Sequence, residues 1–337
     1  MMNVEMFEPS SDDDFWEPSG VPRNVYKVKS WEHSLLGLYE NIMASGEDRS
    51  DRTGTGTRAL FGQTLDVDLT EGFPLATTKK VPFKAVLSEL LWFLAGSGDE
   101  RRLAQIHYGV DGQPSDDMKT IWSANATGTT GAAYVPKFPG DLGRIYGTQW
   151  REWRRFSFGK QVNAASTDGT SQYAWKEDTP VDQIADIIHK LKTNPTDRRI
   201  ILSAHNVGEL NQMALPPCHM FAQFYCNNVG DLSCLMYMRS VDTFLGLPFN
   251  VASYALLTMM IAQVTGLHAH RLKIVMGDTH IYKNHREQVR TVLRREVRTP
   301  PKVVLRAGIL DIDDFSMDDF YLQDYDPHPA VPAPMAA

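Results

Sequence analysis

Apolar residues recur at helical spacing in three stretches of the chain. Residues 31–45 place their apolar positions on one stripe, which predicts an amphipathic helix, whereas residues 83–95 and 249–265 are apolar nearly all round. A helix that is apolar on every side is usually buried, so we expect the second and third helices to be central. A glycine stands where each helix is expected to stop: Gly46, Gly96 and Gly266.

Strand character is concentrated between the second and third of these helices, in residues 199–205, 219–226 and 231–239. The connector 227–230, Asn-Asn-Val-Gly, predicts a hairpin turn between the last two strands. Helices and strands are mixed along the chain without a regular βαβ rhythm. The pattern therefore predicts the α+β fold class.

The ends of the chain and two internal stretches differ from this pattern. Residues 1–25 are rich in acid, proline and serine, and we expect a disordered or loosely draped tail. Gly, Ser, Thr and Asp accumulate in residues 107–140 and 155–180, which predicts two surface insertions. Residues 26–337 contain no repeat and no long linker, so we expect a single domain. Prolines near the C-terminus favour an extended path for the last residues, which could then lie across a surface.

Charge is unevenly distributed along the chain. Of the formal net charge of −7, −5 lies in residues 1–23, which leaves −2 for the rest. A nearly neutral body argues against a DNA-binding groove, which needs a basic stripe. No apolar run approaches the roughly 18 residues that a membrane span requires, and the first residues lack the basic and apolar regions of a secretory signal. We therefore expect neither DNA nor a membrane as a partner.

The chain contains three cysteines, Cys218, Cys226 and Cys234. An odd and sparse set is not a disulfide framework, so a reducing cytoplasm is the expected location. The two intervals between the cysteines are eight residues each, unlike the close spacing of zinc ligands. We predict no metal site.

Cys218 is the candidate nucleophile, because Pro216 and Pro217 fix the backbone immediately before it. A thiolate is a strong nucleophile when positive charge lowers its pKa from about 8.5. The competing interpretation is a buried structural cysteine. A hydrolase that pairs Cys218 with His219 is disfavoured, since neighbouring side chains on a strand point to opposite faces.

Arginines at three places could supply the positive charge. Arg52 lies in a Gly/Thr-rich loop, Arg198 and Arg199 follow a turn-like segment, and Arg239 with Ser240 closes a predicted strand. Guanidinium groups fit phosphate oxygens, and hydroxyl groups can complete the shell. Each arginine taken singly is more typical of an exposed surface. The loop is not a nucleotide P-loop, because no Lys-Ser/Thr pair follows.

Taken together and in order, these segments resemble the thymidylate synthase family from about residue 31 to the last residue. The matching motifs are Asp51–Thr57, Gly72–Lys79, Glu89–Leu94, Ile121-Trp122, Gly140–Gly143, Tyr146–Trp150, Asp197–Arg199, Ala214–His219, Leu245–Asn250 and Gly277–Tyr282. The resemblance implies an α+β fold with a mixed sheet packed by helices. It also implies an obligate homodimer joined through the sheets, whose active sites borrow residues across the interface.

The resemblance further implies a role for individual residues. Cys218 is expected to add to C6 of the uracil ring of dUMP, and 5,10-methylenetetrahydrofolate is the expected co-substrate. Arg52, Arg239 and Ser240 would hold the phosphate together with Arg198 and Arg199 donated by the partner subunit, and the arginines would favour the Cys218 thiolate. The remaining assignments are Glu89 and Tyr146 for proton transfer through ordered water, Asn250 for the base, His280 and Tyr282 for the sugar hydroxyl, Asp242 for both substrates, Trp122 for the folate, Lys79 for its glutamate tail, and Ala337 in a C-terminus that closes over it.

Three positions depart from the usual family pattern: His205, Met238 and Met276. We expect a synthase that makes dTMP and dihydrofolate. The alternative is a dUMP hydroxymethylase, in which water attacks the transferred carbon and tetrahydrofolate is released. A cytidylate substrate is disfavoured because Asn250 stands where that branch has Asp. An inactive homologue that binds nucleotide or RNA is the third possibility.

Overall fold

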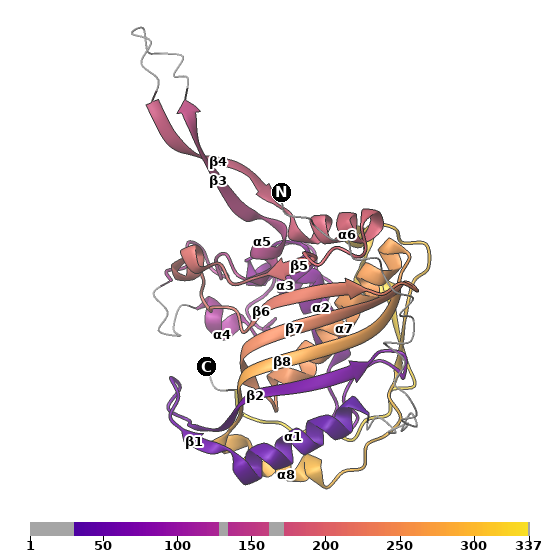
Figure 1. Ribbon diagram of the computed structural model, residues 1–337. Helices are drawn as coiled ribbons and strands as arrows, with labels where there is room; N and C mark the ends of the chain where they lie inside the picture. The colour runs from indigo at the N-terminus through magenta and orange to yellow at the C-terminus, as the bar shows by residue number, and fades with distance from the viewer. Residues whose placement is uncertain (1–29, 128–133, 162–171, 336–337) are drawn as a thin grey trace, which may run out of the picture.

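The computed structural model describes residues 30–127, 134–161 and 172–335 (Figure 1). The predicted tail, residues 1–25, and Ala337 lie outside these ranges. The centre of the molecule is a six-stranded sheet. Its strands are, in spatial order, β1 (Glu47–Arg49), β2 (Thr57–Asp68), β8 (His268–Tyr282), β7 (Asp231–Asp242), β6 (His219–Cys226) and β5 (Ile201–Ser203). Neighbours are antiparallel except β7 and β8, which are parallel, so the sheet is mixed as predicted.

Helices cover one face of the sheet and leave the other open to view (Figure 1). α7 (Gly246–Thr265) packs on β7 and β8, and α2 (Phe83–Leu94) packs on α7. The remaining helices are α1 (Trp31–Ser45), α3 (Glu100–Tyr108), α4 (Ser123–Ala126), α5 (Tyr146–Arg151), α6 (Gln183–Thr193) and α8 (Arg286–Leu293). In the described part of the chain, α7 is the one helix long and apolar enough to cross a membrane, but 78% of that stretch is buried inside the molecule.

The three predicted helices are present, and two match their predicted ends closely. α1 has the predicted bounds, and α2 ends one residue before the predicted end. α7 begins at Gly246, three residues earlier than predicted, because the Asp242 carboxylate accepts the N–H groups of Phe244 and Leu245 and turns the chain into the helix early. Gly266 ends α7 in the left-handed conformation, with φ at +72°.

The strand predictions are confirmed for β6 and its hairpin and need correction at β5. β6 has the predicted bounds, and Asn227 begins a turn to β7, which runs three residues further than predicted. β5 covers only residues 201–203. The reason is that the N–H of Arg199 donates to the Asp197 carboxylate, so a turn occupies the start of the predicted strand.

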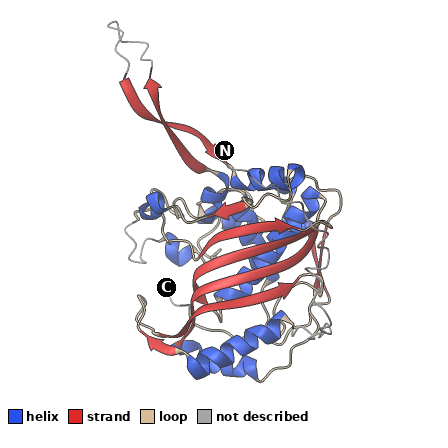
Figure 2. Cartoon of the chain, in the orientation of Figure 1, coloured by secondary structure: helices blue, strands red, loops and turns tan. Residues whose placement is uncertain are grey.

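Two smaller sheets lie outside the central one. β3 (Trp153–Gln161) and β4 (Gln172–Val181) form a two-stranded hairpin that projects from the body (Figures 1 and 2). β9 (Lys302–Leu305) pairs with β10 (Phe320–Gln323). After β10 the chain runs without helix or strand to the end of the described region.

Candidate active site

Cys218 lies at the turn into β6 and is held by the end of β7. The Arg239 guanidinium curls over the proline turn, where its Nε donates to the Pro217 carbonyl at 2.8 Å and its Nη2 to the Pro216 carbonyl at 2.7 Å. Nη2 is also 3.8 Å from the Cys218 sulfur. Two prolines and one arginine therefore fix the position of the thiol.

The ionisation of Cys218 differs from the expectation of a thiolate. Burial raises the pKa of the Cys218 thiol above its usual value, although the Arg239 charge and the Tyr146 hydroxyl both act to lower it. A buried anion needs more compensating charge than one guanidinium supplies. Within this chain the thiol is thus the favoured form, and further positive charge is required to make the nucleophile.

Tyr146 connects Cys218 to an aromatic cluster beneath it. The Cys218 backbone N–H donates to the Tyr146 hydroxyl oxygen at 2.7 Å, and the Tyr146 ring stacks on His219 with 4.1 Å between ring centroids. His219 is hydrogen-bonded to the Tyr254 hydroxyl at 3.0 Å, and burial lowers the pKa of His219 to about 3. The neutral, engaged imidazole is unsuited to be the base of a Cys–His pair. Sequence reasoning did not single out Tyr254, because in the sequence it is one of many buried residues of α7.

Glu89 is a buried carboxyl group with one strong hydrogen bond. The Trp122 indole N–H donates to its Oε1 at 2.7 Å, and the Trp122 ring packs edge-on against Tyr146 at 5.9 Å. Burial raises the pKa of Glu89 to about 7, and the Trp122 bond partly opposes that rise. A carboxyl group with this pKa can both give and accept a proton near neutral pH.

Asp242, His280 and Tyr282 lie at the carboxyl ends of the parallel strands β7 and β8. His280 lies on β8 opposite Asp242 on β7, and its Nδ1 is 2.9 Å from the Asp278 carboxylate. Its Nε2 is buried and has no hydrogen-bond partner among the described residues. Tyr282 lies next to it, with 5.1 Å between the two ring centroids. A buried nitrogen without a partner is costly, so this place suits a ligand hydroxyl group.

The other residues expected to bind the substrate lie around the same end of the sheet, where β7 and β8 end. Ser240 lies on β7 opposite Asp278, and Asn250 is half-buried in the first turns of α7. Arg52 is exposed in the loop between β1 and β2, which the Asp51 carboxylate holds by accepting the N–H groups of Thr53 and Gly56. The predicted residues thus come from elements that are far apart in the sequence.

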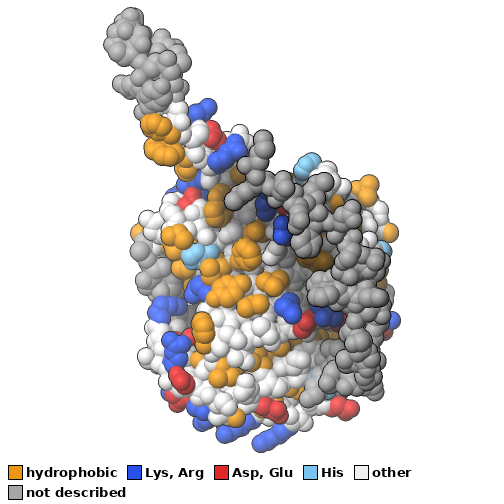
Figure 3. Space-filling view, in the orientation of Figure 1, with side chains coloured by type: hydrophobic (Ala, Val, Ile, Leu, Met, Phe, Trp, Pro, Cys, Tyr) orange, Lys and Arg blue, Asp and Glu red, His pale blue; other side chains and the backbone are white. Residues whose placement is uncertain are grey.

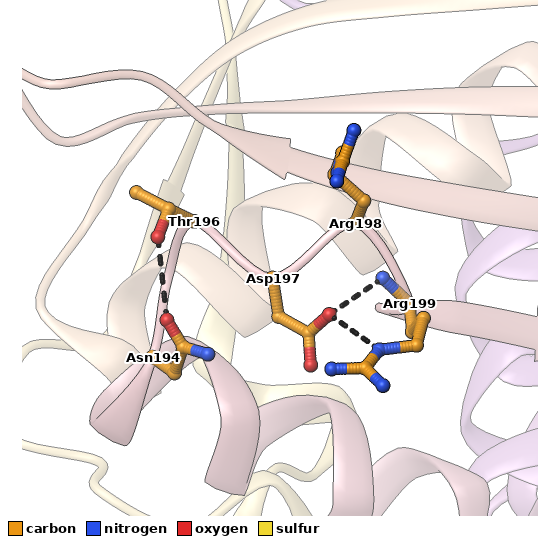
Figure 4. A pocket seen from close by; sticks show the side chains of 5 residues that line it. All are labelled: Asn194, Thr196, Asp197, Arg198 and Arg199. Atoms are coloured by element: carbon orange, nitrogen blue, oxygen red, sulfur yellow. Dashed lines mark hydrogen bonds and ion pairs between the residues drawn. The ribbon is translucent and has the colours of Figure 1, made fainter. Parts of the chain in front are cut away.

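Arg198 and Arg199 lie elsewhere in this chain. They line a shallow pocket of about 520 Å³ with Asn194, Thr196 and Asp197, and both side chains are exposed (Figure 4). The Gln223 amide donates to the Arg198 carbonyl, and Gln223 is five residues along β6 from Cys218. At about 3.3 Å per strand residue, that separation is roughly 17 Å. The structure therefore does not bring this pair to Cys218 within one chain.

Lys79 is not a surface lysine. It is buried, its Nζ donates to the Phe244 carbonyl, and the Nζ is 3.7 Å from the centroid of the Phe244 ring. Burial lowers the pKa of Lys79 to about 8. A contact with a folate glutamate tail would require the side chain to leave the Phe244 carbonyl. The predicted role of Ala337 concerns a residue outside the described ranges.

Two of the three unusual residues are neighbours. Met238 pairs with His219 of β6 on one side and with Met276 of β8 on the other, and both methionines are buried. They form one apolar row across the sheet beneath the Cys218 turn. His205 lies just after β5 and is half-buried.

The chain matches a known protein family. A family model described as Thymidylate synthase matches residues 33–337, nearly the whole chain. The match includes every candidate site residue named above. In the described part of the chain, no group of three His, Cys, Asp or Glu side chains is arranged to hold a metal ion.

Proposed function

The chain belongs to the thymidylate synthase family, and from that premise we propose that it is a synthase that converts dUMP to dTMP. The family comprises folate-dependent one-carbon transferases of nucleotide biosynthesis, which act on dUMP with methylenetetrahydrofolate as co-substrate. The observation that most supports the proposal is the Cys218 turn, where one thiol contacts a guanidinium and a tyrosine hydroxyl accepts the N–H of the same cysteine.

In the proposed reaction Cys218 acts first. Its sulfur bonds to C6 of the uracil ring, and the electron pair of the C5–C6 double bond moves towards O4, which makes C5 nucleophilic. C5 then bonds to the one-carbon unit and loses its proton, and the bond from that carbon to the folate nitrogen breaks, which leaves a methylene group on C5. Methylenetetrahydrofolate supplies that carbon and, in a synthase, the hydride that completes the methyl group. The sulfur–C6 bond then breaks, and Cys218 is regenerated.

The other residues position the substrate and move protons. Asn250 offers an amide donor and acceptor to the O4 and N3–H edge of the base. Glu89, with its pKa near 7, is the proposed proton carrier, working through water with Tyr146. His280 and Tyr282 hold the sugar hydroxyl, with Asp242 beside them. Trp122 faces the folate.

A dimer completes the phosphate site in this proposal. Arg52, Arg239 and Ser240 come from one chain, and Arg198 and Arg199 come from the other. Hydrophobic side chains gather near the middle of the face shown in Figure 3. Tyr225 on β6 and Leu235 on β7 are 64% and 36% exposed, which supports such pairing. An apolar sheet face of this kind is typical of a surface that another subunit covers. The added guanidinium charge would lower the pKa of the Cys218 thiol.

We also propose a cytoplasmic location, which fits three free thiols, Cys218, Cys226 and Cys234.

The second candidate is a dUMP hydroxymethylase. The contiguous Met238–Met276 row favours it, because two departures from the usual family pattern lie together beneath the nucleophile. The deciding factor between the two reactions is water access to the transferred carbon.

Product identification distinguishes the two candidates. The enzyme is incubated with dUMP and methylenetetrahydrofolate, and the nucleotide product is analysed by mass spectrometry. A methyl product and dihydrofolate support the synthase. A hydroxymethyl product with tetrahydrofolate replaces it with the second candidate.

A further inference from the structure

A buried histidine outside the catalytic set holds the C-terminal segment. His285 follows β8 and is fully buried. Its Nε2 is 2.7 Å from the carbonyl oxygen of Pro334. A carbonyl oxygen only accepts, so Nε2 carries the proton and donates it to the tail. Pro334 is three residues from the last residue of the chain.

The His285 ring is clamped from two sides. Its centroid is 5.6 Å from that of Phe244 and 5.5 Å from that of Tyr282. Phe244 is fixed in turn by Lys79, whose ammonium group donates to its carbonyl and lies over its ring. A chain of contacts thus runs from the buried Lys79 through the buried Phe244 and His285 to the exposed Pro334. Lys79 thus holds Phe244 in place, a role that the sequence did not predict.

The rest of the C-terminal segment is anchored independently. The Tyr325 hydroxyl donates to the Ala76 carbonyl at 2.8 Å, the His328 N–H donates to the Thr77 carbonyl at 2.7 Å, and Arg295 donates to the Pro329 carbonyl at 2.7 Å. Among the hydrogen bonds of the described residues, the one to Pro334 is the one that reaches beyond Pro329. Val331 and Ala333 pack against the hydrophobic core, and the hydrogen bond from His285 adds a fixed point at Pro334.

The His285–Pro334 hydrogen bond lies beside the proposed nucleotide site. Tyr282 has His280 on one side and His285 on the other, and each histidine has one buried nitrogen without a hydrogen-bond partner among the described residues. The unpartnered Nδ1 of His285 is 4.0 Å from Asp242. His285 therefore packs against Tyr282, one of the residues expected to hold the sugar hydroxyl.

We propose that His285 is a positioning residue that latches the C-terminal segment through Pro334 and thereby sets the affinity for the folate co-substrate. The proposal rests on the proposed function for its second half, because the folate is the molecule over which the tail closes. His285 does not touch the reacting atoms. It acts through the tail, and Phe244 and Tyr282 hold its ring in the required orientation.

Two substitutions of His285 separate the hydrogen bond from the packing. His285→Gln keeps an N–H donor at the Nε2 position, whereas His285→Leu fills the space without a donor. The first readout needs no substrate: the rate at which a carboxypeptidase releases alanine from the full-length chain. Losing one hydrogen bond is expected to speed release about tenfold in His285→Leu and to leave His285→Gln close to the parent chain.

The second readout is kinetic. The KM for methylenetetrahydrofolate is expected to rise about tenfold in His285→Leu, with dUMP binding unchanged and with rescue by His285→Gln. His328→Leu is the matched control. Its Nε2 makes the same kind of bond, to the Glu296 carbonyl at 3.0 Å, but in the part of the segment that other bonds already anchor.

The outcomes are distinct. Unchanged alanine release in His285→Leu, or equal effects of Leu and Gln, overturns the latch. A comparable effect of His328→Leu on alanine release also overturns it, because the whole segment would then have loosened. If the parent chain turns over neither dUMP nor folate, the proposed function fails, and the alanine release rates still decide whether His285 holds the tail.

Discussion

The Cys218 turn and the Arg198–Arg199 turn are built in opposite ways, although both are expected to serve one active site. Cys218 lies among buried groups that bond to one another: Arg239 over the prolines, Tyr146 under the backbone N–H, and Glu89 beyond Trp122. Arg198 and Arg199 are exposed at a turn, where Asp197 holds the backbone N–H and the Nε of Arg199. One region is closed and inward-facing, and the other is open and outward-facing.

The difference fits the proposal that two chains contribute different groups to one active site. Groups whose protonation must be controlled, such as Glu89, lie inside one chain, where burial shifts their pKa. Arg198 and Arg199, which would supply only charge, lie on the surface, and a guanidinium stays protonated there without a neighbouring group to stabilise its charge. The raised pKa of the Cys218 thiol fits this proposal, since the chain by itself provides too little positive charge for the thiolate.

The largest expected effect comes from the inward-facing region. Cys218→Ser should lower kcat by at least about a thousandfold, because a serine hydroxyl in place of the thiol is a far weaker nucleophile at neutral pH. Binding of dUMP should survive, since the phosphate and base contacts are untouched. Steady-state kinetics and equilibrium nucleotide binding measure the two effects, and full activity in this variant would refute the assignment.

The outward-facing region is tested by mixing chains. Arg198→Ala with Arg199→Ala should lower dUMP affinity about a hundredfold, because two charge-assisted phosphate contacts are lost. If the arginines act across the interface, this double variant mixed with Cys218→Ser regains activity. With random pairing half of the dimers contain one of each chain, and one site in each of these is intact. Recovery should therefore be about a quarter of the parent activity.

The control for the mixing experiment is another exposed arginine. Arg155 on the projecting hairpin is 3.9 Å from Asp178 and belongs to neither region. Arg155→Ala should leave dUMP affinity unchanged. Absence of any recovery in the mixture would mean that Arg198 and Arg199 serve the site of their own chain, and the comparison between the two regions would be wrong.

A smaller effect is expected at Asn250, within the inward-facing region. Asn250→Asp replaces an amide donor by an acceptor, which suits the amino group of cytosine better than O4 of uracil. The ratio of kcat/KM for dUMP to that for dCMP should fall about tenfold or more. An unchanged ratio would show that Asn250 does not contact the base.

The last prediction concerns stability and the buried carboxyl group of Glu89. Burial raises the pKa of Glu89 from 4.5 to about 7, so its charged form is disfavoured in the folded state. The free energy of unfolding should fall by up to about 3 kcal/mol as pH rises from about 4.5 to about 7. Chemical denaturation across this range should show a shallower fall in Glu89→Gln than in the parent chain. Equal slopes would show that Glu89 is not the titrating group.

Sequence patterns predicted the elements whose own residues determine them. α1 has an apolar stripe, and α2 and α7 are apolar nearly all round. β6 and β7 are joined by a turn that its asparagines and glycine favour. The long strands β2 and β8 were not predicted. Gly62 interrupts the pattern of β2, and β8 carries four charged or histidine side chains in its first six residues, so pairing with neighbouring strands rather than local sequence sets their structure.

The residues of the candidate site were predicted from the order of the family's motifs along the chain, because no single residue type or spacing identified them. The motifs named Cys218 and Arg239, and the structure does place their side chains in contact. The sequence could not show that Lys79 is buried under Phe244, or that burial outweighs Arg239 at the thiol, because both depend on groups distant in the chain. His285 was overlooked because a single histidine three residues beyond a motif carries no pattern.

The most direct test of the central claim is to trap the bond between Cys218 and the pyrimidine. 5-Fluoro-dUMP carries fluorine where the reaction must remove a proton, so the sequence of steps should stop at a covalent complex with methylenetetrahydrofolate. Peptide mass spectrometry after this incubation should find the nucleotide and the folate attached through Cys218. No adduct, or an adduct at any other residue, would contradict the account and favour an inactive homologue that only binds nucleotide.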